Sequence, residues 1–216
     1  MEASPLHPVP ELSAHSKIGE RLRAARQEKG LTVRGIAELV GLSPSLISQI
    51  ERDKVNPSVS TLWSLVSVLG LTMSDVFPDE ARRPSSAQPV IPLAPTGPVT
   101  TPGDRSTINL ETGVQWERLT AGSDALVEFL MLVYPPGAAS CDADSLMRHS
   151  GKEYGYVLSG RLGVCIGFDE YELGPGMAIS FDASSPHRLW AIGESPAEAL
   201  WVVVGRQNDS RGPHVA

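Results

Sequence analysis

The segment from Leu31 to Pro57 constrains the fold most, because it carries the pattern of two short helices joined by a tight turn. Four apolar residues in its first half recur at helical spacing and predict one buried stripe: Val33, Ile36, Ala37 and Val40. Thr32 is a suitable N-cap for this helix, and Gly41 suits the turn that ends it. Ser43 then caps a second helix that has Pro44 at its first position, where no backbone N–H is needed.

The second helix of this pair leaves a polar surface exposed. Its apolar residues are expected to face inward, and these are Leu46, Ile47 and Ile50. The outward-facing side chains combine short hydroxyls, one amide and one guanidinium: Ser45, Ser48, Gln49 and Arg52. Such groups can hydrogen-bond base edges and phosphates, so the pattern favours a helix that enters a groove of DNA.

Three more helices are expected around this pair, over about residues 16–29, over an apolar repeat that ends at Gly70, and over residues 73–77. The resulting five-helix domain, residues 15–78, resembles the helix-turn-helix domain of the Xre family, relatives of the lambdoid phage repressors and Cro. The resemblance covers residues 17–77, and its signature lies in residues 42–52 and in Asn56-Pro57.

The resemblance assigns roles to individual residues. It implies base reading by Ser45, Ser48 and Gln49, and phosphate contacts by Arg52 and Lys54. It also implies that the helix N-termini capped by Thr32 and Ser43 belong to the DNA-binding surface. Arg26 and Glu51 match a pair that forms a partly buried salt bridge in this family. The alternative for this domain is a helical bundle that serves as a scaffold and binds no DNA.

The charge distribution favours DNA binding once it is divided between the two halves of the chain. The whole chain has 18 basic and 25 acidic residues, a net charge of −7. Residues 17–78 contain eight basic and six acidic residues, a net of +2, which leaves −9 for the remainder. The positive field therefore surrounds the helical pair and is absent from the rest of the chain.

The remaining segments separate into tails, a linker and a second domain. Residues 1–14 and 207–216 are predicted to be tails, and residues 79–104 are rich in proline and predict an extended linker. No run approaches the roughly 18 apolar residues of a membrane span, so no membrane partner is expected. The two cysteines, Cys141 and Cys165, have no close spacing and are typical of a reducing cytoplasm, where we expect the protein.

Residues 105–206 change to the pattern of a β-domain. Apolar runs of strand length are separated by Gly and Pro turns, and they cover residues 125–134, 153–158, 161–166, 177–181 and 199–204. Short strands at regular spacing predict an antiparallel barrel or sandwich. The expected fold is therefore multidomain, α then β.

The β-domain also contains two histidines and a carboxylate at suggestive spacing. His149 precedes Glu153 by four residues, and His187 follows Gly176 by eleven. The pattern resembles the cupin family, a double-stranded antiparallel β-barrel or jelly roll, and it implies a metal held by His149, Glu153 and His187. Met147 stands where the family's first histidine belongs, so the four-ligand set is incomplete.

Two interpretations of this site stay open. In the first, His149, Glu153 and His187 form a two-histidine, one-carboxylate set suited to Fe, Zn or Ni as a divalent ion. In the second, the barrel has lost its metal and binds an organic effector in a pocket that includes Met147, Phe181 and His187. The two interpretations are compatible with each other.

An Xre-type domain joined to a cupin resembles known bacterial transcription regulators. This architecture implies a homodimer that places two recognition helices on a palindromic operator in double-stranded DNA, with a small-molecule or metal effector in the cupin. It implies no catalytic residues, and the proline-rich linker predicts loose coupling between the domains. The alternative is an enzyme that resembles hydroxypropylphosphonic acid epoxidase, a mononuclear iron oxygenase with a vestigial helix-turn-helix.

Overall fold

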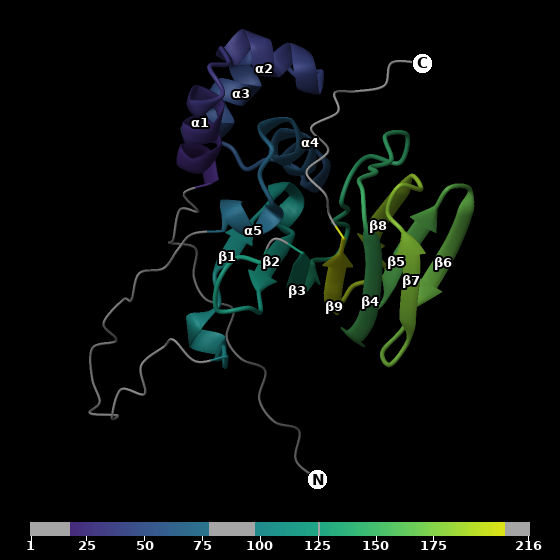
Figure 1. Cartoon of the computed structure of the whole chain (residues 1–216). Coiled ribbons are helices and arrows are strands. Elements are labelled where there is room, and N and C mark those ends of the chain that lie inside the picture. Colours follow the sequence, from purple (N-terminus) through teal and green to yellow (C-terminus); the bar gives the residue numbers. More distant parts are fainter. Residues whose placement is uncertain (1–17, 78–97, 125, 206–216) are drawn as a thin grey trace.

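The computed structural model describes residues 18–77, 98–124 and 126–205. The two predicted tails, the start of the first helix and most of the predicted linker lie outside these residues. Within these residues five α-helices come first, and nine strands follow in two antiparallel sheets (Figure 1). No helix in the described part of the chain combines the length and apolar content needed to cross a membrane.

The helical domain contains α1 (Ile18–Glu28), α2 (Val33–Val40), α3 (Pro44–Ile50), α4 (Val59–Leu69) and α5 (Met73–Val76). The predicted caps of the central pair are confirmed. The Thr32 side chain accepts a hydrogen bond from the Gly35 N–H, and the Ser43 side chain accepts one from the Leu46 N–H. Gly41 ends α2 with φ of 70°, a left-handed conformation that favours glycine.

The helices pack through the apolar faces that the sequence predicts. Ile36 and Ala37 of α2 and Ile47 and Ile50 of α3 are buried, as is the whole apolar repeat of α4. Because α2 packs against α3 and α4, and the apolar residues of α3 belong to the same buried cluster, the polar face of α3 is left on the outside of the domain.

The β-domain consists of a six-stranded and a three-stranded sheet. The larger sheet has the order β1-β2-β3-β9-β4-β7, and the smaller has the order β6-β5-β8. The strands are β1 (Thr107–Asn109), β2 (Gln115–Arg118), β3 (Val127–Tyr134), β4 (Lys152–Ser159), β5 (Leu162–Ile166), β6 (Asp169–Leu173), β7 (Ala178–Asp182), β8 (His187–Ala191) and β9 (Ala197–Val204). This arrangement confirms the predicted antiparallel β-domain.

Five strands coincide with the predicted apolar runs, and four were not predicted. The strands missed are β1, β2, β6 and β8. Strand β6 has the sequence DEYEL, and four of its five residues are exposed, because it is an edge strand of the smaller sheet. Strand β1 is only three residues long. Neither has the alternating or continuous apolar pattern that marks a strand in a sequence.

One face of each central strand points into the domain. Burial alternates along β3 and β9, where Leu130, Leu132, Trp201 and Val203 face inward. Gly155 of β4 also faces inward, and an added Cβ there would lie 2.1 Å from the ring of Trp201. The absence of a side chain at Gly155 is therefore what lets the Trp201 ring lie across β4.

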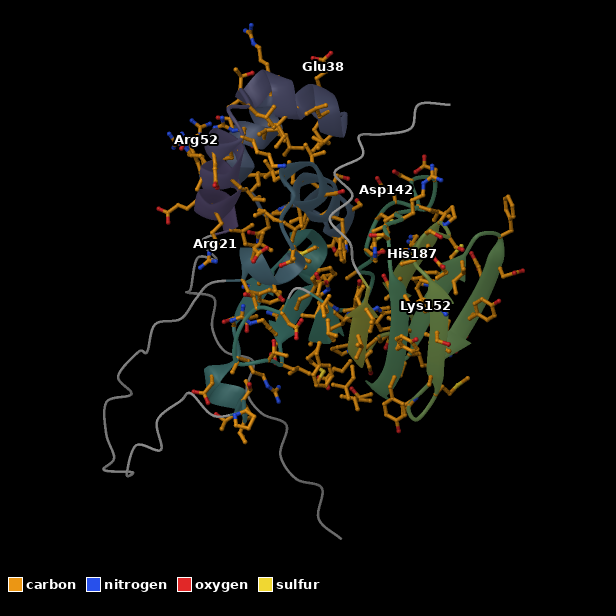
Figure 2. All side chains as sticks on the ribbon, viewed as in Figure 1. Arg21, Glu38, Arg52, Asp142, Lys152 and His187 are labelled. Carbon is orange, nitrogen blue, oxygen red and sulfur yellow. The ribbon has the colours of Figure 1, made fainter. Side chains whose placement is uncertain are left out.

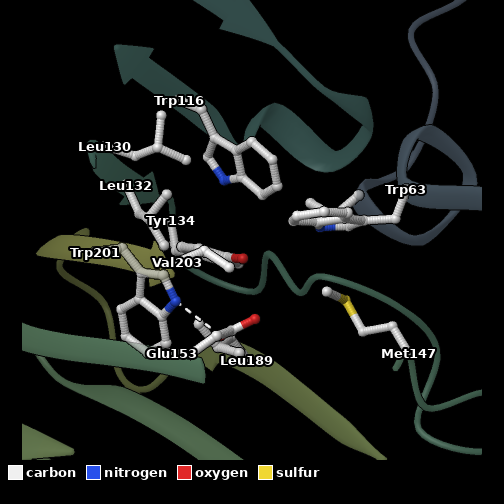
Figure 3. A pocket seen from close by; sticks show the side chains of 11 residues that line it. Trp63, Trp116, Leu130, Leu132, Tyr134, Met147, Glu153, Leu189, Trp201 and Val203 are labelled. Carbon is white, nitrogen blue, oxygen red and sulfur yellow. Dashed lines mark hydrogen bonds between the residues drawn. The ribbon is translucent and has the colours of Figure 1, made fainter. Parts of the chain in front are cut away.

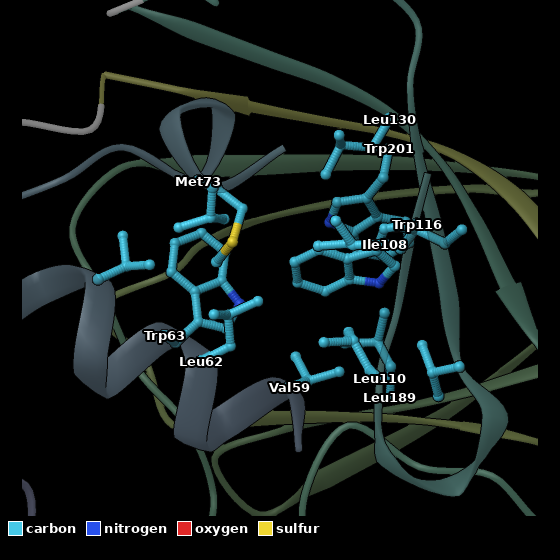
Figure 4. Packing of buried hydrophobic residues seen from close by; sticks show 14 of the residues in the cluster. Val59, Leu62, Trp63, Met73, Ile108, Leu110, Trp116, Leu130, Leu189 and Trp201 are labelled. Atoms are coloured by element: carbon cyan, nitrogen blue, oxygen red, sulfur yellow. The ribbon is translucent and has the colours of Figure 1, made fainter. Parts of the chain in front are cut away.

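The helical domain lies directly against the β-domain. The Glu111 N–H donates to the Pro57 carbonyl at 2.9 Å, and the Ser60 N–H donates to the Ser140 carbonyl at 3.2 Å. The Met73 N–H donates to Oε1 of Glu128 at 3.0 Å. Figure 4 shows the apolar side chains of α4 and α5 facing those of the β-domain in one buried cluster. The prediction of loosely coupled domains is therefore wrong, because residues outside the linker join them.

Candidate functional site

The polar face of α3 lies on the outer side of the helical domain. Ser45 is exposed, and Ser48 and Gln49 are half-buried. The Gln49 amide donates to the Ser45 hydroxyl at 3.5 Å, a long contact that DNA could readily replace. These three side chains follow one another on the helix surface, so a single groove could contact all of them.

Two exposed cations flank this face. Arg52 and Lys54 follow the end of α3, and both are exposed. The Arg52 Nε–H donates to the Ser48 carbonyl at 2.9 Å, which holds the guanidinium beside the helix end. Figure 2 shows Arg52 on the outer side of the helical domain. Thr32 and Ser43 are exposed at the N-termini of α2 and α3, where backbone N–H groups attract phosphate.

A buried ion pair lies at the C-terminal end of α3. Arg26 of α1 makes a two-pronged contact with Glu51, with Nε to Oε1 at 2.5 Å and Nη2 to Oε2 at 2.8 Å. A third donor, Nη1, bonds the Leu31 carbonyl at 2.7 Å. The contact with Glu51 raises the pKa of Arg26, so the guanidinium stays charged although it is buried. This pair joins α1 to the end of α3.

The structure brings His149, Glu153 and His187 together from different elements. Glu153 lies on β4 of the larger sheet, and His187 begins β8 of the smaller one. His149 precedes β4, where its N–H donates to the Ala183 carbonyl. One potential ligand atom from each of the three residues lies within 4.8 Å of the others.

The donor atoms of this triad point toward one another. Nε2 of His149 lies 2.7 Å from Oε1 of Glu153, and Nε2 of His187 lies 3.4 Å from the same oxygen. Among the described residues, neither Nε2 has a well-aligned hydrogen-bond partner, despite these short distances. Both nitrogens are buried. Buried nitrogens that converge on a carboxylate without good hydrogen bonds suit a cation placed between them.

The opposite side of each ligand is held by a hydrogen bond. Nδ1 of His149 donates to the Ser150 carbonyl at 3.0 Å, and Nδ1 of His187 donates to the Ser185 carbonyl at 2.9 Å. Because a carbonyl only accepts, these bonds leave the Nε2 lone pair of each neutral ring directed at the site. Trp201 Nε1 donates to Oε2 of Glu153 at 2.7 Å, which leaves Oε1 to face the imidazoles. Such outer contacts are typical of protein metal ligands.

The electrostatics of the triad keep the carboxylate charged. Burial by itself would raise the pKa of Glu153, but short polar contacts and charge attraction from His149 and His187 outweigh it and hold the pKa at about 2. Burial would lower the pKa of His187, yet contact with Glu153 raises it above the ordinary value. Glu153 therefore stays ionised and is the negatively charged ligand that the site offers to a cation.

A small cavity lies beside the triad, and about 20 Å³ of it is open to the centre of a water molecule (Figure 3). The part of it that a water molecule can occupy holds about one water. Apolar and aromatic side chains line it together with Glu153, and these are Val59, Trp63, Trp116, Leu130, Leu132, Tyr134, Met147, Leu189, Trp201 and Val203. An organic molecule larger than a water molecule therefore requires the lining to move.

The remaining predicted pocket residues lie in different positions. Met147 lines the cavity, and its backbone pairs with that of His187. Phe181 packs near His187, with ring centroids 5.2 Å apart, but does not line the cavity. Met147 and Phe181 therefore both lie beside His187, Met147 through its backbone and Phe181 through its ring on β7.

Sequence reasoning missed two residues of the site. Trp201 falls in the predicted apolar run of residues 199–204, but its hydrogen bond to Glu153 depends on the pairing of β9 with β4. Trp63 belongs to α4 of the helical domain, where its position in the sequence predicts only a buried helix residue. Its indole stacks on the His149 imidazole, with centroids 4.1 Å apart and an interplanar angle of 12°. Nothing local to either sequence segment signals this contact.

Comparisons with known proteins identify both domains. A family model described as Helix-turn-helix matches residues 22–76, and one described as Cupin domain matches residues 130–203. A crystal structure of an HTH_3 family transcriptional regulator from Vibrio cholerae is 24% identical, with a TM-score of 0.61, over 89% of this chain and 97% of that one. This likeness shows a shared fold.

The structure of hydroxypropylphosphonic acid epoxidase from S. wedmorenis is 18% identical, with a TM-score of 0.42, over 88% of this chain and 98% of that one. This similarity is too low to carry an argument for the enzyme alternative. The HTH-type transcriptional regulator PuuR of Escherichia coli (strain K12) is 33% identical over 171 residues, which are 78% of this chain and 84% of PuuR. This chain belongs to the family of DNA-binding transcriptional regulators in which an Xre-type helix-turn-helix domain precedes a cupin domain.

Proposed function

We propose that this regulator binds a two-fold symmetric operator as a homodimer and that a divalent metal in the cupin domain controls its affinity for DNA. The observation that supports a metal is the convergence of three buried donor atoms. The other polar atom of each of these side chains is held by a hydrogen bond. Fe²⁺, Zn²⁺ and Ni²⁺ all accept two imidazoles and one carboxylate. We place the regulator in the cytoplasm, with its DNA.

The homodimer is supported by an apolar surface on the outside of the larger sheet. Tyr154, Tyr156 and Leu158 of β4 are exposed large apolar residues, and Val204 of the neighbouring β9 is another. Contiguous exposed apolar residues often mark a protein interface. Two copies joined there would each contribute one α3, and the two helices would enter successive major grooves about 34 Å apart.

A small organic effector is the second candidate occupant of the cupin domain. The apolar lining of the cavity favours it, since ten of the eleven lining residues carry no ionised group. Such a molecule must displace part of this lining to enter. A small-molecule screen by thermal shift, with and without metal, tests this candidate, because an effector raises the melting temperature of the state that it binds.

The metal proposal is tested by metal analysis and operator binding. Protein purified without chelator is expected to contain about one divalent metal per chain. An operator selected from random DNA should bind with an affinity that changes by about 5-fold to 150-fold when the metal is removed and restored. Protein without metal above background, or metal without effect on DNA binding, would show that the proposal is wrong.

The DNA-binding surface makes a separate prediction. Gln49→Ala is expected to reduce discrimination at one base pair by about 1–3 kcal/mol, because a side-chain amide can bond one base edge at two points. Lys54→Ala should weaken binding to all sequences alike and make it less dependent on salt, since a phosphate contact carries no sequence information. Binding to a library of operator variants at two salt concentrations measures both effects. Equal loss of specificity in the two variants would contradict these roles.

A further inference from the structure

One wall of the candidate metal site comes from the DNA-binding domain. The Trp63 indole of α4 lies flat against the His149 imidazole, with ring centroids 4.1 Å apart, and it makes an edge-to-face contact with Trp116 of β2, with centroids 6.1 Å apart. Trp63 is only 6% exposed, although it lies between two domains. Figure 3 shows it across the cavity from Glu153, on a different element from all three candidate ligands.

We propose that Trp63 is a positioning residue that couples the metal site to the DNA-binding domain. It holds the His149 ring in the orientation that binds metal, and a bound metal in turn holds α4 against the β-domain. This inference rests on the proposed metal site and adds the route by which that site reaches DNA.

His149 depends on the helical domain more than the other two ligands do. His187 is completely buried and is held within its own domain by the Ser185 carbonyl and the Phe181 ring. Glu153 is held by Trp201. The His149 ring, by contrast, has one hydrogen bond to Ser150 and an edge contact with the His187 ring, and its stacked partner is Trp63 of the helical domain. Removal of the indole therefore frees this ring to turn its Nε2 away from Glu153.

The same helix, α4, contacts both the β-domain and the other helices of the DNA-binding domain. Val59, one turn before Trp63, lines the cavity, and Ser60 donates its N–H to the Ser140 carbonyl. On its other side α4 packs against α1 and α2, in the core that also contains Ile47 and Ile50 of α3. A movement of α4 relative to the sheets therefore moves α3 as well. Since binding couplings are reciprocal, metal that favours the docked helix must bind more tightly when the helix is docked.

The test uses the full-length chain with Co²⁺ alone as the probe. Trp63→Leu is expected to weaken Co²⁺ binding by about 10-fold, the lower range for loss of a contact that orients a ligand. It should also shift the visible absorption bands of bound Co²⁺. In this variant, Co²⁺ should no longer change the affinity for the operator. Trp63→Phe, which keeps an aromatic face, should restore most of the Co²⁺ affinity, the absorption bands and the effect of Co²⁺ on operator affinity.

A matched control is Trp190→Leu. Trp190 lies on the face of β8 opposite His187 and packs over Arg188, outside the cavity. The Trp190→Leu variant should match the wild type in Co²⁺ affinity, in the absorption spectrum of bound Co²⁺ and in the effect of Co²⁺ on operator affinity. If Trp63→Leu does not fold, Trp63→Met replaces it, because a flexible apolar chain fills the space without stacking.

The outcomes separate this inference from the function on which it rests. Normal Co²⁺ affinity and a normal Co²⁺ effect on DNA in folded Trp63→Leu would overturn the inference and leave the metal site intact. Failure of the wild-type protein to bind Co²⁺ would overturn both. A weakened, spectrally altered site that Trp63→Phe rescues would support the role of Trp63.

Discussion

Replacing Glu153 with glutamine is expected to lower the affinity for a divalent metal by more than about 100-fold, which exceeds the upper range for the loss of a contact that only orients a ligand. The amide keeps the shape of the carboxylate but lacks the negative charge, and Glu153 is the only carboxylate of the triad. Titration of metal-free protein with Zn²⁺ or Co²⁺ measures the change.

Two further variants test whether the loss of affinity is specific to Glu153 as a ligand. Trp201→Phe removes the hydrogen bond to Oε2 of Glu153 and should cost about 10-fold to 100-fold in metal affinity. Glu170→Gln removes an exposed carboxylate on β6 and should have no effect. If folded Glu153→Gln binds metal like the wild type, Glu153 is not a ligand and the metal lies elsewhere.

Replacing Glu51 with alanine is expected to destabilise the helical domain by about 3–5 kcal/mol. The substitution leaves the Arg26 guanidinium buried without its carboxylate, and the bond to the Leu31 carbonyl, the one that remains among the described residues, does not neutralise the charge. Urea unfolding of the full chain, followed by its helical circular dichroism, measures the loss, because this signal comes from α1–α5. DNA binding should fall together with the folded fraction.

An exposed pair provides the control for this prediction. Arg161 and Glu172 are both more than half exposed, so Arg161→Ala should cost less than about 1 kcal/mol. The double variant Arg26→Met with Glu51→Leu should recover most of the stability lost in Glu51→Ala, since it leaves no unpaired buried charge. A loss in Glu51→Ala no larger than that in Arg161→Ala would show that the pair contributes little.

The helical domain was predictable in detail because its signals are local. Thr32, Ser43 and Gly41 mark helix ends through bonds to residues three or four positions away, and the apolar spacing identifies each buried face. The strands were less predictable. Charged β6 is stabilised by pairing with β5, and the residues of β6 themselves do not show this.

The candidate metal site was predictable only in part. The spacing of His149 and Glu153, followed by His187, identified three residues whose potential ligand atoms lie within 4.8 Å of one another in the fold. Trp201 joins them because β9 pairs with β4, a contact between strands far apart in the chain. The proline-rich linker led to an incorrect expectation of loose coupling, because the residues that join the domains lie in the two folded domains themselves.

By itself, the sequence determined the helix-turn-helix pair, its outward polar face, the β-class of the second domain and the three candidate ligands. Each of these follows from the spacing of residues near one another or from a short motif. Only the tertiary structure decided that Trp63 of α4 lies on His149 and that the two domains share one buried cluster. The physical reason is that an apolar residue on a helix carries no mark of what it packs against, which is settled only when the chain folds.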